Sequence, residues 1–292
     1  MTSAPGDAAD RLRRALAPSV LPARVQQAAQ TAPPDPQPGQ LWRARWEETS
    51  ELVAVLRVTT DAVEAAPVTL DVEYADNDAA VVPAGESPLG VDTVTWIGLR
   101  RVLPMTVLDR FLGEWPVKSL MAGTGSVIVN PADPRAEYRA YLEDELDLLA
   151  AARWAPTGAG TLAEELRAAG IDPQRLVALL DLAPQEALAL LRGRLPVTAE
   201  QAETLAPALN RTVEQILAAN PAPPAEIVSL LDRPRRRPQV QALARRRGMS
   251  EVTARQTAAF GVWRLAARQV GDRTEPAWDA RLERYFHVTL NG

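Results

Sequence analysis

Few side chains in this chain can do covalent or metal chemistry. Its 292 residues include no cysteine and one histidine, His287. A Ser-His-Asp triad would need His287, an HExxH zinc site needs two histidines, and thiolate chemistry needs cysteine. The only lysine, Lys118, follows Pro116-Val117 rather than glycine, so a Walker A motif is absent. The sequence therefore predicts a protein that is not an enzyme and holds no metal or cofactor.

Arginine is the side chain that remains for binding chemistry. Residues 232–255 contain eight arginines against Asp232 and Glu251, and Pro234 and Pro238 predict an exposed, non-helical arm for the first run. The second run precedes Gly248 and is expected to end a helix. We expect phosphate contacts from six of these side chains. They are Arg235, Arg236, Arg237, Arg245, Arg246 and Arg247.

The charge distribution indicates that a polyanionic partner would bind the second half of the chain. The net charge is −5, which argues against a generic polyanion binder. Residues 1–156 hold 14 basic and 22 acidic groups, a net −8, whereas residues 157–292 hold 18 and 15, a net +3. The acidic run 143–147 should lie on one helix without converging, so we expect a solvated face or ion pairs with the arginines rather than a metal site.

The first half of the chain has the pattern of short strands. A helix is expected over 7–31, followed by a stiff proline-rich linker over 33–38. Residues 67–74 give the clearest strand, because Val68, Leu70, Val72 and Tyr74 alternate with polar residues. Further strands are expected over 41–46, 51–58, 79–82, 93–97 and 126–130, and a helix over 135–154. Strands at this spacing predict a small barrel or sandwich.

Residues 161–220 are divided into five short helices by their own start and stop signals. Capping boxes are expected at Thr161-Glu164, Thr198-Gln201 and Thr212-Gln215, and Asp172-Pro173 and Pro184 can start the other two helices. The expected stops are Gly170, Gly193, Asn210 and Asn220. Helices of about eight residues must pack on one another to be stable.

This segment, LAEELRAAGIDPQRLVALLDLAPQEALALLRGRLPVTAEQAETLAPALNRTVEQILAAN, resembles the lambda-repressor-like (XRE-type) helix-turn-helix family. Leu176-Val177 matches the family's Leu-Ala of helix two, Leu182 its turn valine, and Gly193 its glycine after helix three. Ala187 and Leu190 match the isoleucines of helix three, and Leu205-Ala206 and Leu209 the leucines of helix four. The resemblance covers about a fifth of the chain and implies sequence-specific binding of double-stranded DNA.

In that family the third helix enters the major groove. The resemblance places Ala183, Pro184, Gln185, Glu186 and Ala189 against the duplex, with Arg192 and Arg194 on phosphates. Gln185 would bind adenine and Glu186 would accept from cytosine. Leu188 and Leu191 stand where the family has polar residues, and residues 161–220 carry five basic and eight acidic groups, a net −3. A helix-turn-helix used for protein contact or dimerisation is therefore the alternative.

The strand-rich region resembles the SH3-like barrel of PemK/MazF-type toxins. The resemblance lies in GQLWRARW, ELVAVLRV and a Leu-Asp-x-x-Leu-Gly segment at 108–113, which in that family is a closing helix. A ribonuclease would use an arginine such as Arg43, Arg45, Arg57 or Arg100. The acidic surface around 71–78 argues against RNA, so we expect a non-catalytic barrel that senses a signal or contacts a protein partner.

Together these patterns predict an α+β fold: an N-terminal small β-barrel-like domain, an all-α lambda-repressor-like helix-turn-helix domain and a C-terminal helical region. The expected divisions are 1–40, 41–120, 121–156, 157–221 and 222–292. We expect a cytoplasmic, homodimeric transcriptional regulator that binds double-stranded DNA, without a membrane span. The alternative is an antitoxin-like or stress-response adaptor with a degenerate helix-turn-helix.

Overall fold

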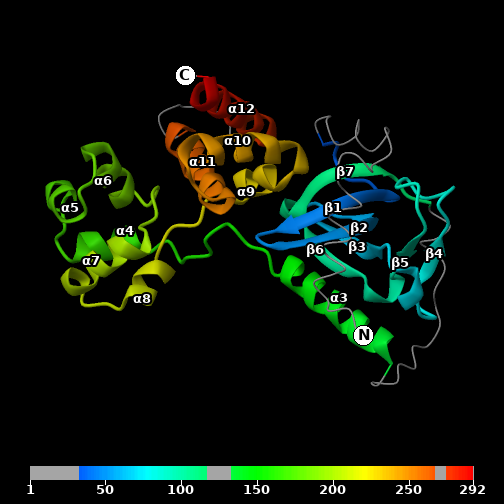
Figure 1. Ribbon diagram of the computed structural model, residues 1–292. Coiled ribbons are helices and arrows are strands. Elements are labelled where there is room, and N and C mark those ends of the chain that lie inside the picture. The colour runs from blue at the N-terminus through cyan, green and yellow to red at the C-terminus, as the bar shows by residue number, and fades with distance from the viewer. Residues whose placement is uncertain (1–32, 117–132, 267–273, 292) are drawn as a thin grey trace. The chain divides into compact units, whose positions relative to one another are not determined.

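The structure, a computed structural model, describes residues 33–116, 133–266 and 274–291. The fold is α+β, with an N-terminal antiparallel sheet followed by helices (Figure 1). Two compact units share the chain: the first reaches to Ala152 and also takes Asp232–Pro238, and the second holds Arg153–Leu231 and the residues from Gln239 onward. The helix expected over 7–31 and the strand expected over 126–130 lie outside the described residues.

Seven strands form the sheet of the first unit. They are β1 Gln40–Trp46, β2 Thr49–Val58, β3 Ala62–Thr69, β4 Ala80–Val82, β5 Thr93–Thr95, β6 Arg101–Pro104 and β7 Leu108–Glu114. Their order is β4-β5-β3-β2-β1-β7, with β6 pairing β3 beside β5. No described pairing joins β7 back to β4, so the sheet is not closed.

The strand expected over 67–74 is wrong beyond Thr69. The chain leaves β3 there, and Val72–Tyr74 form a 3-10 helix, η1. Val72 and Tyr74 still pack against the core, and the Tyr74 ring stacks on that of Tyr138 with 4.5 Å between centroids. A turn can therefore satisfy an alternating apolar pattern without a strand.

The helix expected at the Leu-Asp-x-x-Leu-Gly segment is also wrong, because this segment forms strand β7. It pairs antiparallel with β1, where Trp42 faces Phe111 and Arg43 faces Arg110. Leu108 and Leu112 are buried on the two sides of the sheet. The helix was implied only by the resemblance to the toxin barrel; the segment instead pairs with a strand that lies about 66 residues earlier, and strand formation depends on such neighbours.

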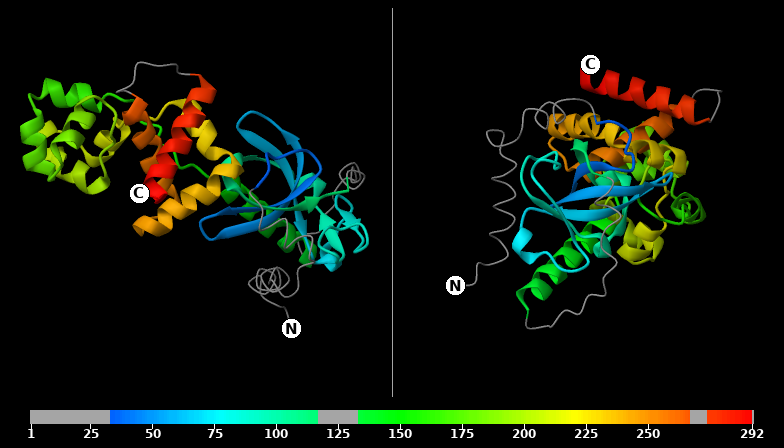
Figure 2. Two further views of the ribbon diagram at one scale, coloured as in Figure 1. Left: turned by 90° about the horizontal axis from the view of Figure 1, so that it is seen from above. Right: turned by 90° about the vertical axis from the view of Figure 1, so that its right-hand side faces the viewer.

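Helix α3, Pro134–Ala150, lies in the segment that was predicted to be helical, and it covers one face of the sheet (Figure 2). Leu142, Leu146 and Leu149 are buried there with Trp42 and Trp96. The opposite face holds a second core that includes Leu41, Leu52 and Trp115. Both sides of the sheet are therefore apolar, and burial at about 25 cal/mol per Å² is the main stabilisation of this unit.

The second half of the chain is helical. The helices are α4 Leu162–Ala168, α5 Pro173–Leu180, α6 Pro184–Leu191, α7 Ala199–Leu209, α8 Val213–Ala218, α9 Ala225–Asp232, α10 Arg237–Arg247, α11 Glu251–Ala266 and α12 Glu275–Asn291. Short 3-10 helices η2 Ile97–Leu99, η3 Met105–Val107 and η5 Pro234–Arg236 complete the described elements. None of the described helices combines the length and apolar character needed to cross a membrane.

Helices α4 to α8 lie where the five short helices were predicted and share one apolar core. Asp172 accepts from the backbone N–H of Arg175 at 2.8 Å, and both capping boxes after residue 197 form. The box at Thr161 does not form, because that hydroxyl bonds the Glu165 carboxylate at 2.9 Å instead. Asn210 ends α7 in the left-handed region with φ 51°.

Candidate nucleic-acid interface

Helix α6 is attached to the core of α4 to α8 by one side only. Asp181 ends α5 with φ 49°, and Pro184 starts α6 three residues later, where a proline needs no N–H partner. Ala187 and Leu190 are buried in the core of this group. Because residues three and four apart share a helix face, the opposite face of α6 is turned away from this core.

The residues expected to contact DNA are placed unequally on α6 and the turn after it. Gln185 and Arg192 are exposed and Arg194 is half-buried. In the described part of the chain, none of these three side chains has a hydrogen bond or ion pair. Ala189 is only 9% exposed, so it would offer little surface to a duplex. It lies on the same side of α6 as Gln185 and Leu188 and is not part of the core.

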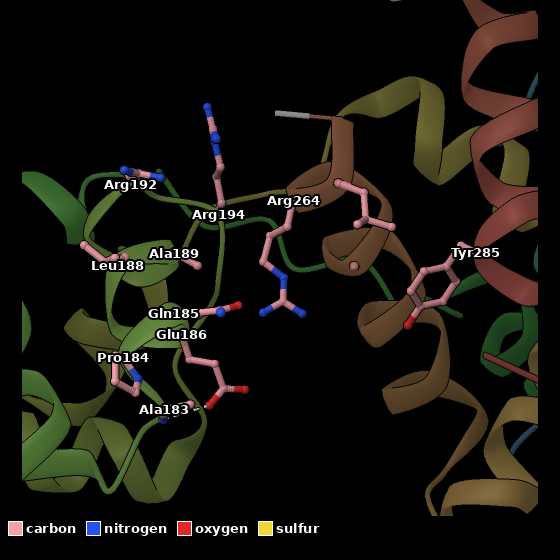
Figure 3. A pocket seen from close by; sticks show the side chains of 12 residues that line it. Ala183, Pro184, Gln185, Glu186, Leu188, Ala189, Arg192, Arg194, Arg264 and Tyr285 are labelled. Carbon is pink, nitrogen blue, oxygen red and sulfur yellow. Dashed lines mark hydrogen bonds between the residues drawn. The ribbon is translucent and has the colours of Figure 1, made fainter. Parts of the chain in front are cut away.

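The Glu186 side chain caps its own helix, which limits its availability to a base. Its carboxylate accepts from the backbone N–H of Ala183 at 3.2 Å, which satisfies a donor at the start of α6 (Figure 3). The expected bond to a cytosine amine would compete with this cap. Gln185 is therefore the base-reading candidate that the helix leaves uncommitted.

A cleft of 720 Å³ lies between α6 and the helices α11 and α12 within the second unit (Figure 3). Arg264, Gly261 and Leu265 of α11 and Tyr285 of α12 line the wall opposite α6. The Arg264 side chain extends from its helix toward Gln185 and Glu186. No local pattern predicts this wall, because α11 lies about 70 residues after α6.

The second arginine run agrees with its expected position. Arg245, Arg246 and Arg247 are exposed in the last turn of α10, and Gly248 ends the helix with φ 62°. Arg246 donates to the carbonyl oxygen of Leu290 in α12. The other two guanidinium groups have no hydrogen bond or ion pair within the described residues, so they can meet an anion.

The first arginine run is not an exposed arm, and this corrects the expectation for Arg236 and Arg237. These side chains belong to the first unit and are 2% and 4% exposed, and Arg235 is half-buried. Pro234 starts η5 and Pro238 is the second residue of α10, positions where proline does not break a helix. The prolines therefore did not exclude a folded segment.

Arg237 is a structural residue of the first unit. Its guanidinium donates to the carbonyl oxygens of Thr106 at 3.0 Å, Val107 at 2.9 Å and Arg45 at 3.1 Å. It also lies 3.9 Å from the carboxylate of Asp109. Burial alone would raise the pKa of Asp109, but Arg237 and Arg43 lower it below its ordinary value. A phosphate contact by Arg237 would require leaving all these partners.

The arginines that a ribonuclease site would use are also occupied. Arg43 pairs with Asp109, and Arg57 and Arg100 both pair with Glu64, at 3.1 Å and 3.6 Å. Arg45 donates to the carbonyl of Glu47 at 3.5 Å. Arg57 and Arg100 share one carboxylate, and Arg43 and Arg45 are held by other groups, so each of the four arginines already has a partner.

Comparison with known proteins finds no family model that matches this chain and no matching curated protein. Among the described residues, no group of three or more acidic or histidine side chains is arranged to hold a metal ion. The candidate site consequently rests on the geometry of α6, its neighbouring arginines and the cleft.

Proposed function

We propose that this protein binds double-stranded DNA sequence-specifically and regulates transcription. The observation that carries the proposal is the solvent-exposed side chain of Gln185, on the cleft-lining face of a helix that is fixed to the core by Ala187 and Leu190. A glutamine amide can pair with adenine N6 and N7 in the major groove. The resemblance of residues 162–220 to lambda-repressor-like domains gives α6 the role of recognition helix.

Exposed and half-buried arginines of the second unit supply the electrostatic part of the proposal. Arg192 and Arg194 follow the recognition helix, and Arg245 and Arg247 add exposed charge at the end of α10. Phosphate contacts fix the register of a protein on DNA without reading its sequence. Because operators are often two-fold symmetric, we expect a homodimer, with the sheet-containing unit sensing a signal or contacting a protein partner.

Selection of duplexes from a random-sequence library by the full chain tests this function. We expect one enriched sequence, a relaxed preference at one or two base pairs with Gln185→Ala, and uniformly weaker binding with Arg192→Gln. The salt slope should fall by about one in the second variant. Arg110→Gln, an exposed arginine on β7, is the matched control and should change neither property. An unchanged chain that enriches no sequence would contradict the proposal.

A protein-interaction adaptor is the second candidate, and the exposure of Leu188 favours it. This leucine is 40% exposed on α6, where an apolar side chain suits a protein partner better than a phosphate backbone. The net charge of −3 over residues 161–220 points the same way. The adaptor predicts duplex binding that ignores sequence, together with a protein partner whose affinity falls in Leu188→Ser.

A further inference from the structure

The cleft between α6 and α11 has the charge and size of a site for a small organic anion. Arg192, Arg194 and Arg264 line it and have no carboxylate partner within the described residues. Its one acidic residue, Glu186, is bonded to the N–H that starts its own helix. Three guanidinium groups against one carboxylate leave a formal charge of +2 in the cleft.

Size excludes a DNA duplex as the occupant of this cleft. Its 720 Å³ lies within the range of roughly 300–1,000 Å³ that small-molecule sites occupy. The major groove alone is about 12 Å wide, and one turn of duplex is about 34 Å long. The occupant must therefore be much smaller than the polyanion that α6 is proposed to read.

Apolar side chains and one aromatic ring form the rest of the cleft lining. Leu188 on one wall and Leu265 on the other are 40% and 48% exposed. Tyr285 is half-buried beside Gly261, and its hydroxyl bonds the carbonyl of Thr257 at 3.4 Å, which leaves the ring fixed on the cleft wall. A ligand with a planar ring and a charged end can use both kinds of surface.

We propose that this cleft binds an organic phosphate of nucleotide size, with Arg264 as the arginine that extends into the cleft and Arg192 and Arg194 at its rim (Figure 3). Regulation follows if the proposed DNA-binding function also holds. Gln185, Arg192 and Arg194 would serve both partners, so the ligand and the duplex exclude each other. The ligand is then the signal that releases the protein from DNA.

Calorimetric titration of the full chain, without DNA, tests the site itself. The probes are the four common ribonucleoside 5′-diphosphates and inorganic pyrophosphate, each alone. We expect saturable binding of at least one diphosphate, weakened about ten-fold or more in Arg264→Gln because a charge-assisted bond is lost. Weaker binding of pyrophosphate would show that the apolar and aromatic lining contributes.

Two variants make the titration decisive. Arg284→Gln removes an exposed arginine of α12 that does not line the cleft and should leave the affinity unchanged. Arg192→Gln, at an exposed position that cannot disturb the core, should weaken the ligand about three-fold, as a rim contact would. No saturable binding, or equal losses in Arg264→Gln and Arg284→Gln, would overturn the site.

Competition with DNA is measured separately, so the two proposals can fail independently. A saturating concentration of the ribonucleoside diphosphate that binds most tightly should weaken binding of the selected duplex by about ten-fold or more. Ligand binding by a chain that binds no duplex would leave the site standing and remove the DNA-binding function. Simultaneous binding of both partners would overturn their mutual exclusion.

Discussion

At the scale of single residues, Glu51 shows how the fold changes the chemistry of a side chain. This carboxyl on β2 is 6% exposed. Its pKa is raised from 4.5 to about 8, first by burial and then by the charge of Glu145, while a hydrogen bond with Tyr141 acts to lower it. Asp71, which accepts from the hydroxyl of Tyr138 at 2.7 Å, adds to the increase. Glu51 is therefore protonated in the folded protein at neutral pH.

The pKa of Glu51 makes the stability of the first unit depend on pH. The unfolded chain releases this proton near pH 4.5, and the folded chain keeps it up to about pH 8. The stabilisation is full below pH 4.5 and is lost as the pH rises toward 8, by at most about 1.4 kcal/mol per pH unit. Glu51→Gln stays neutral, so we expect a flatter profile and a higher free energy of unfolding at the upper end.

Urea unfolding at about pH 5 and about pH 8 measures this effect, because these two pH values span most of the range between the unfolded and folded pKa of Glu51. Glu48→Gln, which removes an exposed carboxylate from the neighbouring turn, is the control and should keep the original slope. Equal slopes for the unchanged chain and Glu51→Gln would show that Glu51 is not the group responsible.

At the scale of elements, the sequence predicted best where the signals are local. The first residues of α5, α7 and α8 could be predicted, because the N-cap side chain of each helix bonds a backbone N–H only three residues later. The strands β3 and β7 were predicted less well, because partners far along the chain determine them. Pro67 lies inside β3, a residue that argues against a strand, and its carbonyl accepts from the N–H of Trp96 at 2.9 Å.

The group α4 to α8 is closed by a backbone contact at Gly158. A Cβ added there would lie 2.1 Å from the carbonyl oxygen of Asn220, which accepts from the N–H of Gly160 at 3.0 Å. The Asn220 side chain also accepts from the N–H of Val197 at 2.8 Å. Because backbone on both sides is held by hydrogen bonds, the contact cannot relax cheaply.

We therefore expect Gly158→Ala to destabilise α4 to α8 by about 1 to 3 kcal/mol, the usual cost of overpacking. Thermal unfolding followed by circular dichroism measures the loss. Gly85→Ala is the matched control, since a Cβ at that position meets no atom within 4 Å. A melting temperature that falls equally in both variants, or in neither, would contradict a special role for Gly158.

At the scale of the whole molecule, the sequence predicted one side of the candidate site and missed the other. Helix α6 could be placed because its caps and its buried positions are local. The burial of Arg237 could not, because its carbonyl partner Val107 lies 130 residues earlier. The same holds for Arg264, which reaches the cleft only because α11 folds back within the second unit. Long-range contacts determine which of the abundant arginines remain for a ligand.

The small volume of the cleft has a consequence for DNA binding. A duplex cannot enter 720 Å³, so the proposed recognition face of α6 can meet a major groove only after α11 and α12 withdraw from it. The chain has no cysteine, so Leu188→Cys with Leu265→Cys places two unique thiols on opposite walls. A cleavable bis-maleimide that joins these thiols would hold the two walls together.

We expect the cross-linked chain to bind the selected duplex at least about ten-fold more weakly, because the binding-competent state can no longer form. Cleaving the linker should restore the affinity, as measured by fluorescence anisotropy. Each single-cysteine variant treated with the same reagent controls for the modification of either leucine. Full affinity in the cross-linked chain would mean that DNA contacts another surface, and α6 would then face α11 for a reason other than access to the duplex.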